Sequence, residues 1–311
     1  MSEDNIISVK CRLLELFSTL DNEEVAHVEK WICSHAFKKD LEIKKSLTNS
    51  EKSLVKIGKT IKKLIPFNAE LPSETIAPPT VGDQADVTKE SSCHIDEFLY
   101  DDNEVEDLTK QGKLKRFYCL DCNSRNIKEL TLLSHSTSRR ALQCIFKFLL
   151  PKDIEDKQIL DVGSRLGAVL YGAYYLSNVG SIVGVEMNKE CCELQERIIG
   201  QYSMDADRIK VIHSDILDRS DIVHNSDIIV VNTLDHFLDA DKHKQIWYFF
   251  KKHIKKGSYL ITSRSMADTL SGLEIFDELI SWITICRPNQ MENEVFFAPE
   301  DCDEIFLYTV N

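Results

Sequence analysis

The sequence predicts a doubly wound α/β fold with a mostly parallel sheet of seven strands in the second half of the chain. The first observation is that short β-branched runs alternate with stretches of helical periodicity from residue 158 onward. The second is a glycine-bearing turn that joins the first of these runs to the helix after it. Alternating strands and helices favour a parallel sheet, because each connection between parallel strands crosses back over the sheet as a helix.

Five runs rich in β-branched residues are predicted to be parallel strands, with a helix after each of the first four. The strands are expected at 158–162, 181–186, 209–213, 227–232 and 258–262. The helices are expected at 167–178, 188–202, 216–224 and 239–254. A further helix at 269–283 and a closing pair of strands at 294–298 and 304–310 complete a distinctive order.

The part of the chain before this domain is predicted to contain three regions. Residues 1–65 have apolar residues at helical spacing and are expected to be an α-helical N-terminal region. The lysines on one of its helix faces, Lys52, Lys56, Lys59 and Lys63, are interpreted as a solvated face, although they could contact an acidic partner. Residues 66–92 are rich in proline and polar residues and are expected to be a flexible linker. A cysteine- and histidine-bearing module at 93–135 then precedes the domain at 136–311.

Composition limits the class of protein. A length of 311 residues favours two folded units, and 43% hydrophobic with 29% charged residues is ordinary for a globular chain. The net charge of −13 opposes a general nucleic-acid binder, because phosphate contacts need clustered Lys and Arg. No apolar run approaches the ~20 residues of a membrane-spanning helix, and the N-terminus lacks the pattern of a secretory signal. An intracellular protein of the cytoplasm or nucleus is therefore expected.

The turn after the first strand has the features of a nucleotide-cofactor loop. Gly163 and Gly167 stand where the backbone must bend or approach a ligand closely. Glu186 ends the next strand, where an acid can accept hydrogen bonds from the ribose hydroxyls of an adenosine cofactor. A two-glycine turn alone is also common for packing reasons. Asp215 and Asn232, which end the later strands, favour the cofactor because all these loops open at the carboxyl edge of the sheet.

On these motifs, residues 155–311 resemble a class I, seven-strand S-adenosylmethionine-dependent methyltransferase with a Rossmann-like fold. The resemblance implies S-adenosylmethionine as the cofactor. The residues that it assigns to the first motif, around the methionine moiety, are Asp161, Gly163, Ser164 and Gly167. It further implies that Glu186 holds the ribose, that Asp215 and Ile216 contact adenine, and that Asn232 lies near the methionine end.

A narrower resemblance is to the non-SET histone lysine methyltransferases of the disruptor-of-telomeric-silencing family. The shared features are an aspartate, glycine, serine opening, a glycine-valine-glutamate acid loop and a valine-asparagine-asparagine fourth motif. This chain departs from that pattern with Arg165 at the middle glycine of the first motif and Thr233 at the second asparagine. A guanidinium in that turn could pair with the cofactor carboxylate, bind an acidic group of the substrate or obstruct the site.

Candidates for catalysis follow the fourth strand and precede the first. Methyl transfer from a sulfonium needs alignment in a dry, preorganised pocket, so a dedicated base is optional. Asp235 and His236 could orient or deprotonate an incoming amine, thiol or imidazole, although a polar start to the next helix is the plainer interpretation. Residues 134–136 could line the pocket. A helix N-cap at Ser136 or Ser138 is the plainer account of that segment.

The C-x-x-C pair Cys119 and Cys122 has the spacing with which two thiolates bind one zinc ion. Cys93 and His94 would complete a Cys₃His site in a small zinc module, with His135 as the alternative fourth ligand. Unliganded thiols and a redox dithiol are the other interpretations. The redox pair is less favoured because it does not open a helix after a strand. Without secretion, the ten cysteines are expected to be buried thiols and metal ligands rather than a disulfide framework.

The primary functional hypothesis is a methyltransferase that acts on a protein side chain or a small nucleophilic metabolite, such as an imidazole, thiol or amine. The alternative is a catalytically inactive, methyltransferase-like scaffold that recruits a protein partner through the N-terminal helices or the zinc module. A dinucleotide-dependent oxidoreductase shares the loop and the ribose acid, but the closing strand pair and Asp215 argue against it. The acidic charge disfavours RNA as the acceptor.

Overall fold

The computed structural model describes residues 3–76, 87–88, 90–121, 126–232, 234–286, 302 and 304–311. The chain divides after Asn49 into two compact units, and the division falls within helix α3 (His35–Ile61). No helix in the described part of the chain has both the length and the apolar character that crossing a membrane requires.

The first unit consists of helices. It contains α1 (Glu3–Phe17), α2 (Asn22–Ile32) and the first part of α3. Asp21 caps α2 in a capping box, because its carboxylate accepts from the Glu24 backbone N–H while the Glu24 side chain accepts from the Asp21 N–H. Apolar side chains along α1 are exposed to solvent, among them Leu14 at 71%.

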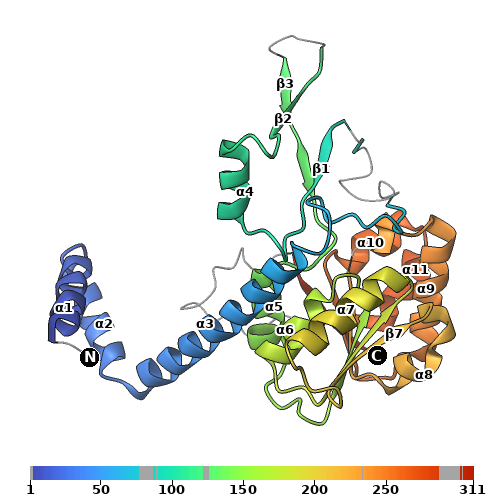
Figure 1. Cartoon of the computed structure of the whole chain (residues 1–311). Coiled ribbons are helices and arrows are strands. Elements are labelled where there is room, and N and C mark those ends of the chain that lie inside the picture. Colours follow the sequence, from blue (N-terminus) through green and yellow to red (C-terminus); the bar gives the residue numbers. More distant parts are fainter. Residues whose placement is uncertain are drawn as a thin grey trace. The chain divides into compact units, whose positions relative to one another are not determined.

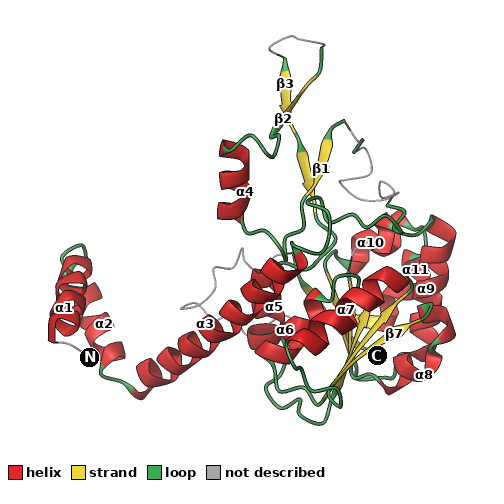
Figure 2. Cartoon of the chain, viewed as in Figure 1, coloured by secondary structure: helices red, strands yellow, loops and turns green. Residues whose placement is uncertain are grey.

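The second unit is built on a seven-stranded sheet (Figures 1 and 2). Its strands are β5 (Gln158–Val162), β6 (Ser181–Glu186), β7 (Ile209–His213), β8 (Ile228–Val231), β9 (Tyr259–Thr262), β10 (Ile283–Ile285) and β11 (Phe306–Val310), in the order β10-β11-β9-β8-β5-β6-β7. The five strands from β5 to β9 are parallel, and β11 runs antiparallel between β9 and β10. The predicted positions of the parallel strands are thus confirmed to within a residue or two.

Helices cover both faces of this sheet. Figure 1 shows α5 (Arg139–Cys144) and α6 (Ala168–Leu176) on one side of the sheet and α8 (Ser220–Asn225) and α9 (Ala240–His253) on the other. The remaining elements are η1 (Ile145–Leu149), α7 (Lys189–Gln201), η2 (Ile216–Asp218), η3 (Leu234–His236), α10 (Met266–Gly272), α11 (Phe276–Leu279) and η4 (Ile280–Trp282). Because side chains alternate along a strand, Leu160 and Val162 enter the core under α9, whereas Asp161 between them points to the other face.

The end of the sheet differs from the sequence prediction. The expected helix at 269–283 is broken after α10, where Glu274 has a left-handed φ of 59°, and α11 is a single turn. Ile283, predicted to end the helix, instead begins β10 and pairs with Val310 of β11. The predicted strand at 294–298 lies outside the described residues.

The segment before the sheet contains short elements. They are β1 (Ser92–His94), α4 (Asp102–Lys110), β2 (Phe117–Cys119), β3 (Ile127–Glu129) and β4 (Thr131–Leu133). Strands β1 and β4 pair in parallel, and β2 and β3 form an antiparallel hairpin. In and just after the last part of α3, Leu54, Ile57 and Ile61 are buried while Lys52, Lys56, Lys59 and Lys63 are exposed.

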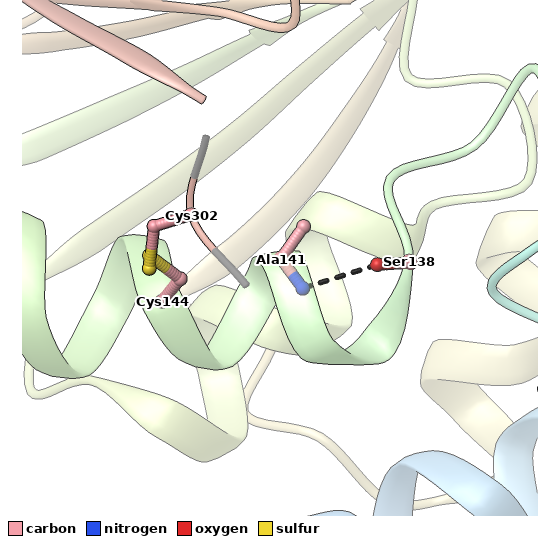
Figure 3. The surroundings of a disulfide bond; sticks show 4 residues. All are labelled: Ser138, Ala141, Cys144 and Cys302. Atoms are coloured by element: carbon pink, nitrogen blue, oxygen red, sulfur yellow. Dashed lines mark hydrogen bonds between the residues drawn. A yellow bond between two sulfur atoms is a disulfide. The ribbon is translucent and has the colours of Figure 1, made fainter. Parts of the chain in front are cut away.

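One pair of cysteines is bonded, contrary to the expectation of thiols and metal ligands alone. Cys144 at the end of α5 forms a disulfide with Cys302, which lies beside that helix (Figure 3). The two residues are 158 positions apart in the sequence, and their Cα atoms are 6.0 Å apart. The bond therefore ties the helix before the first strand of the sheet to the segment before its last strand. Cys191 and Cys192 in α7 are buried free thiols, as expected.

Candidate functional site

The loop between β5 and α6 has the conformation that its glycines predict. Gly163 and Gly167 have φ values of 70° and 85°, in the left-handed region that favours glycine. A Cβ at position 167 would lie 2.6 Å from the ring of Tyr171, so a side chain there would collide with the helix that follows. A Cβ at position 163 would meet Leu234 Cδ2 at 3.6 Å, which places η3 directly over the loop.

Neighbouring side chains fix this loop on β6 and α7. Ser164 Oγ donates to Gln195 Oε1 at 2.9 Å, and Gln195 Nε2 donates to the carbonyl of Arg165 at 2.8 Å. Gly184 of β6 allows the close approach, because a Cβ there would lie 2.8 Å from Ser164 Oγ. The first motif is therefore held rigidly by buried polar contacts.

Two buried carboxyl groups lie at the carboxyl ends of β5 and β6. Glu186 accepts hydrogen bonds from the backbone N–H groups of Arg165, at 2.8 Å, and Asn188, at 2.7 Å. Burial nevertheless raises the pKa of Glu186 above its usual range. Burial, together with the charge of Glu186, raises the pKa of Asp161 to about 8. The Asp161 carboxyl is therefore mostly protonated at neutral pH.

The Arg165 side chain is buried and bound entirely by protein groups. Its Nε donates to Glu74 Oε1 at 2.6 Å, its Nη1 lies 3.3 Å from Asp96 Oδ2, and its Nη2 donates to the carbonyl of Ala69. The Arg165 backbone has a φ of 42°, in the left-handed region, as does Ala69 with a φ of 56°. Arg165 thus ties the segment around residues 69–74 to the loop between β5 and α6.

The residues implied for the adenine and methionine ends are each engaged with a neighbour. Asp215 accepts from the Leu217 backbone N–H at 3.0 Å and pairs with Lys242 Nζ at 2.8 Å, and Ile216 is buried beside it. Asn232 follows β8, and its Nδ2 donates to Thr137 Oγ1 at 3.3 Å. The structure therefore brings the loops of β5, β6, β7 and β8 to one edge of the sheet.

A cavity of about 610 Å³ opens beside this edge, beyond the ends of β8 and β9. The lining comes from the segment before α5, from η3 and α9, from the loop after β9 and from the start of β11. It includes Ser134, Ser136, Thr137, Ser138, Asn232, Asp235 and His236. The predicted pocket role of the segment at 134–136 is consistent with this lining. Ser138 also caps α5, because its Oγ accepts from the Ala141 backbone N–H at 3.1 Å (Figure 3).

Both predicted catalytic side chains border the cavity, and both are buried. Asp235 forms an ion pair with Arg264. His236 packs against His135 with ring centroids 4.6 Å apart. Burial, with the nearby charge of Arg165, lowers the pKa of His135 to about 2, so that ring is neutral at physiological pH. These contacts support a positioning role for Asp235 and His236 as readily as proton transfer.

Three further residues of the cavity were not found from the sequence. Glu97 and Glu304 line it from opposite ends of the unit's sequence, and Trp247 lines it from α9. Burial, followed by the charges of Glu304, Asp96 and Asp102, raises the pKa of Glu97 to about 7. No motif marks these residues, because only the folded chain brings their segments together.

The predicted zinc ligands do not form a site within the described residues. No group of three or more His, Cys, Asp or Glu side chains there could hold a metal ion. Cys93 is half-buried, Cys119 is exposed, and Cys122 lies outside the described residues. His94 Nδ1 instead lies 2.9 Å from His135 Nε2, and His94 Nε2 lies 3.3 Å from Glu70 Oε1. The zinc module stays a prediction.

Comparisons with known proteins found one family model and a number of solved structures to which the chain is similar. Residues 126–265 match the model of an O-methyltransferase family. Among solved structures, the chain is similar to an RNA methyltransferase from Salinibacter ruber in complex with S-adenosyl-L-homocysteine, at 13% identity over 41% of this chain and 76% of the other, with a TM-score of 0.34. It is also similar to a putative O-methyltransferase from Klebsiella pneumoniae, at 13% identity over 58% and 83%, with a TM-score of 0.38.

A third similar structure is a putative S-adenosylmethionine-dependent methyltransferase from Streptococcus mutans, at 14% identity and a TM-score of 0.40. The match covers 58% of this chain and about half, 51%, of that one. No curated relative matches the chain. The match to the family model, and the sheet with its glycine loop and closing antiparallel strand, support the resemblance of the second unit to a class I S-adenosylmethionine-dependent methyltransferase.

Proposed function

We propose that the protein transfers a methyl group from S-adenosylmethionine to a nucleophile held in the cavity at the ends of β8 and β9. The observation that carries this proposal is the position of the cavity. It adjoins Asn232 and η3, next to the loop that carries the buried acids Asp161 and Glu186. The acceptor is a protein side chain or a small amine, imidazole or thiol.

The residues of the loop edge suit the chemistry of this cofactor. Glu186 is oriented by two backbone N–H groups and retains acceptor capacity for ribose hydroxyls. Gly163 leaves the backbone of the loop exposed beneath Leu234. S-adenosylmethionine supplies an electrophilic methyl group on a sulfonium. The protein then has to orient the acceptor and exclude water, which a preformed cavity does.

Isothermal titration with S-adenosylmethionine tests the cofactor assignment. We expect the unchanged protein to bind, Glu186→Ala to lose most of the affinity, and Glu196→Gln on the exposed face of α7 to bind like the unchanged protein. Thermal unfolding of each variant separates lost binding from lost folding. Absence of binding by the intact protein would remove the enzymatic proposal. If the protein binds S-adenosylmethionine, incubation with labelled donor and fractionated lysate would identify the acceptor.

The second candidate is the catalytically inactive scaffold, which one observation favours. The Arg165 guanidinium, at the position of a glycine in the related motif, is already paired with Glu74 and Asp96 and is not available to a cofactor carboxylate. On this hypothesis the intact protein does not bind S-adenosylmethionine, whereas Arg165→Gly gains binding. The partner would be a protein that contacts the N-terminal helices. Equal binding by both forms would exclude obstruction by Arg165.

A further inference from the structure

Residues 69–74, between α3 and β1, form a strap on the loop between β5 and α6. Glu74 accepts two parallel hydrogen bonds from the Arg165 guanidinium, from Nε to Oε1 at 2.6 Å and from Nη2 to Oε2 at 3.0 Å. The two side chains expose only 4% and 7% of their surface. Such a bidentate pair is the arrangement with which arginine recognises a carboxylate. The guanidinium of the loop is therefore occupied by a carboxylate of the chain itself.

The strap has a second anchor at the start of α7. Ser73 Oγ accepts from Asn188 Nδ2 at 2.9 Å and donates to Glu190 Oε2 at 2.5 Å. Arg165 and Asn188, whose side chains hold the strap, are also the two residues whose backbone N–H groups donate to Glu186. The strap is thus attached on both sides of the proposed ribose acid.

Glu186 is covered where a ribose would have to reach it. Only 9% of its surface is exposed. Burial, and then the nearby charge of Glu74, raise the pKa of Glu186, which indicates that the two carboxyl groups lie close together. Among the described residues that line the cavity of about 610 Å³, none belongs to positions 163–167, and Glu186 is not one of them. Ribose hydroxyls therefore need the strap to move before they can reach Glu186.

The Arg165 guanidinium lies on the side of the loop that faces η3. Its central carbon is 6.0 Å from the ring centroid of Phe237, which directly follows η3. Asn232, proposed for the methionine end of the cofactor, ends the strand just before η3. A carboxylate that arrived at this end would find the same two donors, Nε and Nη2, that Glu74 uses.

We infer that the strap is autoinhibitory: Glu74 occupies Arg165 in place of the carboxylate of S-adenosylmethionine, and the strap leaves when the cofactor binds. This inference rests on the proposed function, since it states how access to the same site is regulated. Exchange of one carboxylate for another keeps the buried guanidinium paired. A ligand without a carboxylate would leave Arg165 with Asp96 alone, and an incompletely paired buried charge is costly.

The backbone of the strap favours its release. Ala69 is held at a φ of 56°, which a residue with a side chain rarely adopts, and its carbonyl accepts from Arg165 Nη2. This conformation persists because the contacts with Arg165 impose it. When a ligand takes over the guanidinium, Ala69 can return to an ordinary backbone conformation, so the closed and open strap form a two-state element.

Hydrogen exchange of the full chain, measured by mass spectrometry with and without saturating S-adenosylmethionine, tests the direction of movement. We expect peptides that span residues 69–74 to exchange faster with the cofactor bound. The reason is that the hydrogen bonds from Ala69 N–H to the Pro66 carbonyl and from Leu71 N–H to Glu74 are lost. Peptides of α8 serve as the internal reference. A strap that closed over bound cofactor would exchange more slowly, and either slower or unchanged exchange would overturn the inference.

Isothermal titration measures how strongly the strap competes. Glu74→Gln keeps the size of the side chain but removes its charge, and we expect it to bind S-adenosylmethionine about tenfold more tightly than the unchanged protein. Affinity for a site that is mostly closed is reduced by the fraction of open molecules. Ser73→Ala loosens the strap at α7 without touching the buried pair, so it should give a smaller gain and covers the case in which Glu74→Gln does not fold. Glu196→Gln, at an exposed position of α7, should bind like the unchanged protein.

Decarboxylated S-adenosylmethionine, which lacks only the carboxylate, is the matched ligand. The unchanged protein should bind it at least about tenfold more weakly than S-adenosylmethionine, because it cannot replace Glu74 on Arg165. Equal affinity for the two ligands, or equal affinity of the unchanged protein and both strap variants for S-adenosylmethionine, would overturn the inference and leave the proposed function intact. Binding by Glu74→Gln alone would support the strap and assign the unchanged chain to the inactive alternative. Absence of binding by every form would end the proposed function and the inference together.

Discussion

Arg165 Nε and Glu74 Oε1 lie 2.6 Å apart, and both side chains are almost completely buried. They come from positions 91 residues apart in the sequence. The arginine that departs from the related glycine motif thus has a structural partner in this chain. This ion pair holds the segment that carries Glu74 on the loop between β5 and α6. It therefore accounts for two differences from the sequence-based expectation: an arginine in the glycine motif, and a packed segment where a flexible linker was expected.

Arg165→Ala is expected to destabilise the protein by about 3–5 kcal/mol, because it leaves the buried carboxylates of Glu74 and Asp96 without a counter-charge. Urea unfolding monitored by tryptophan fluorescence measures the change. Arg197→Ala on the exposed face of α7 is the matched control and should change stability little. A loss for Arg165→Ala no larger than that of the control would show that the buried pair contributes nothing net.

Asp161 makes stability depend on pH. Its pKa is 3.8 when unperturbed and about 8 in the folded protein, so unfolding releases its proton between these values. Stability from this group is complete below pH 4 and is lost as the pH rises toward 8. Asp161→Asn should therefore flatten the decrease in stability between pH 5 and pH 8.

Urea midpoints at pH 5, 6, 7 and 8 for the two proteins measure this slope. Asp207→Asn, at an exposed position, is the control and should keep the slope of the unchanged protein. If the Asp161→Asn variant lost stability with pH as steeply as the unchanged protein, Asp161 would be ionised in the folded state.

Breaking the bond between Cys144 and Cys302 is expected to lower stability by about 2–5 kcal/mol, because the reduced chain regains the freedom of a long loop when it unfolds. Cys144→Ser or a dithiol reductant should give the same loss in unfolding experiments. Cys11→Ser, at an exposed free thiol, should have no effect. If the reductant lowered the stability of Cys144→Ser by the same amount, the effect would come from another source.

Zinc binding by Cys93, His94, Cys119 and Cys122 predicts about one metal ion per chain in freshly purified protein. Elemental analysis measures it. Cys119→Ser should lower the zinc content, whereas Cys33→Ser in the first unit should not. Less than about half a zinc ion per unchanged chain would argue for unliganded thiols.

The parallel strands could be located from the sequence because each is a short apolar run between polar loops. This local pattern is enough to predict a buried strand. The antiparallel edge was harder to predict. Ile283 continues the apolar spacing of the preceding helix, so its assignment to a helix was wrong; only its pairing with Val310 makes it a strand. A local pattern does not contain that long-range pairing.

The candidate site shows the same limit. Glycine conformation and strand-end acids are local properties, so the turn at Gly163 and Gly167 and the position of Glu186 at the end of β6 could be predicted from spacing. The partners of Arg165, the cavity position of Glu97 and the bond at Cys302 depend on segments that meet only in the folded chain. Residue types at these positions are ordinary for solvated loops, and the sequence therefore gave no signal for them.

The disulfide makes the middle of the molecule a covalent ring. All five parallel strands lie between Cys144 and Cys302, whereas β11 lies outside the ring, and it pairs with β9 inside it. A single protease cut anywhere within the ring would leave its two fragments joined. The nicked chain would migrate as one species without reductant and as two with it, so a break in a surface loop would not release the half of the sheet that carries the candidate site.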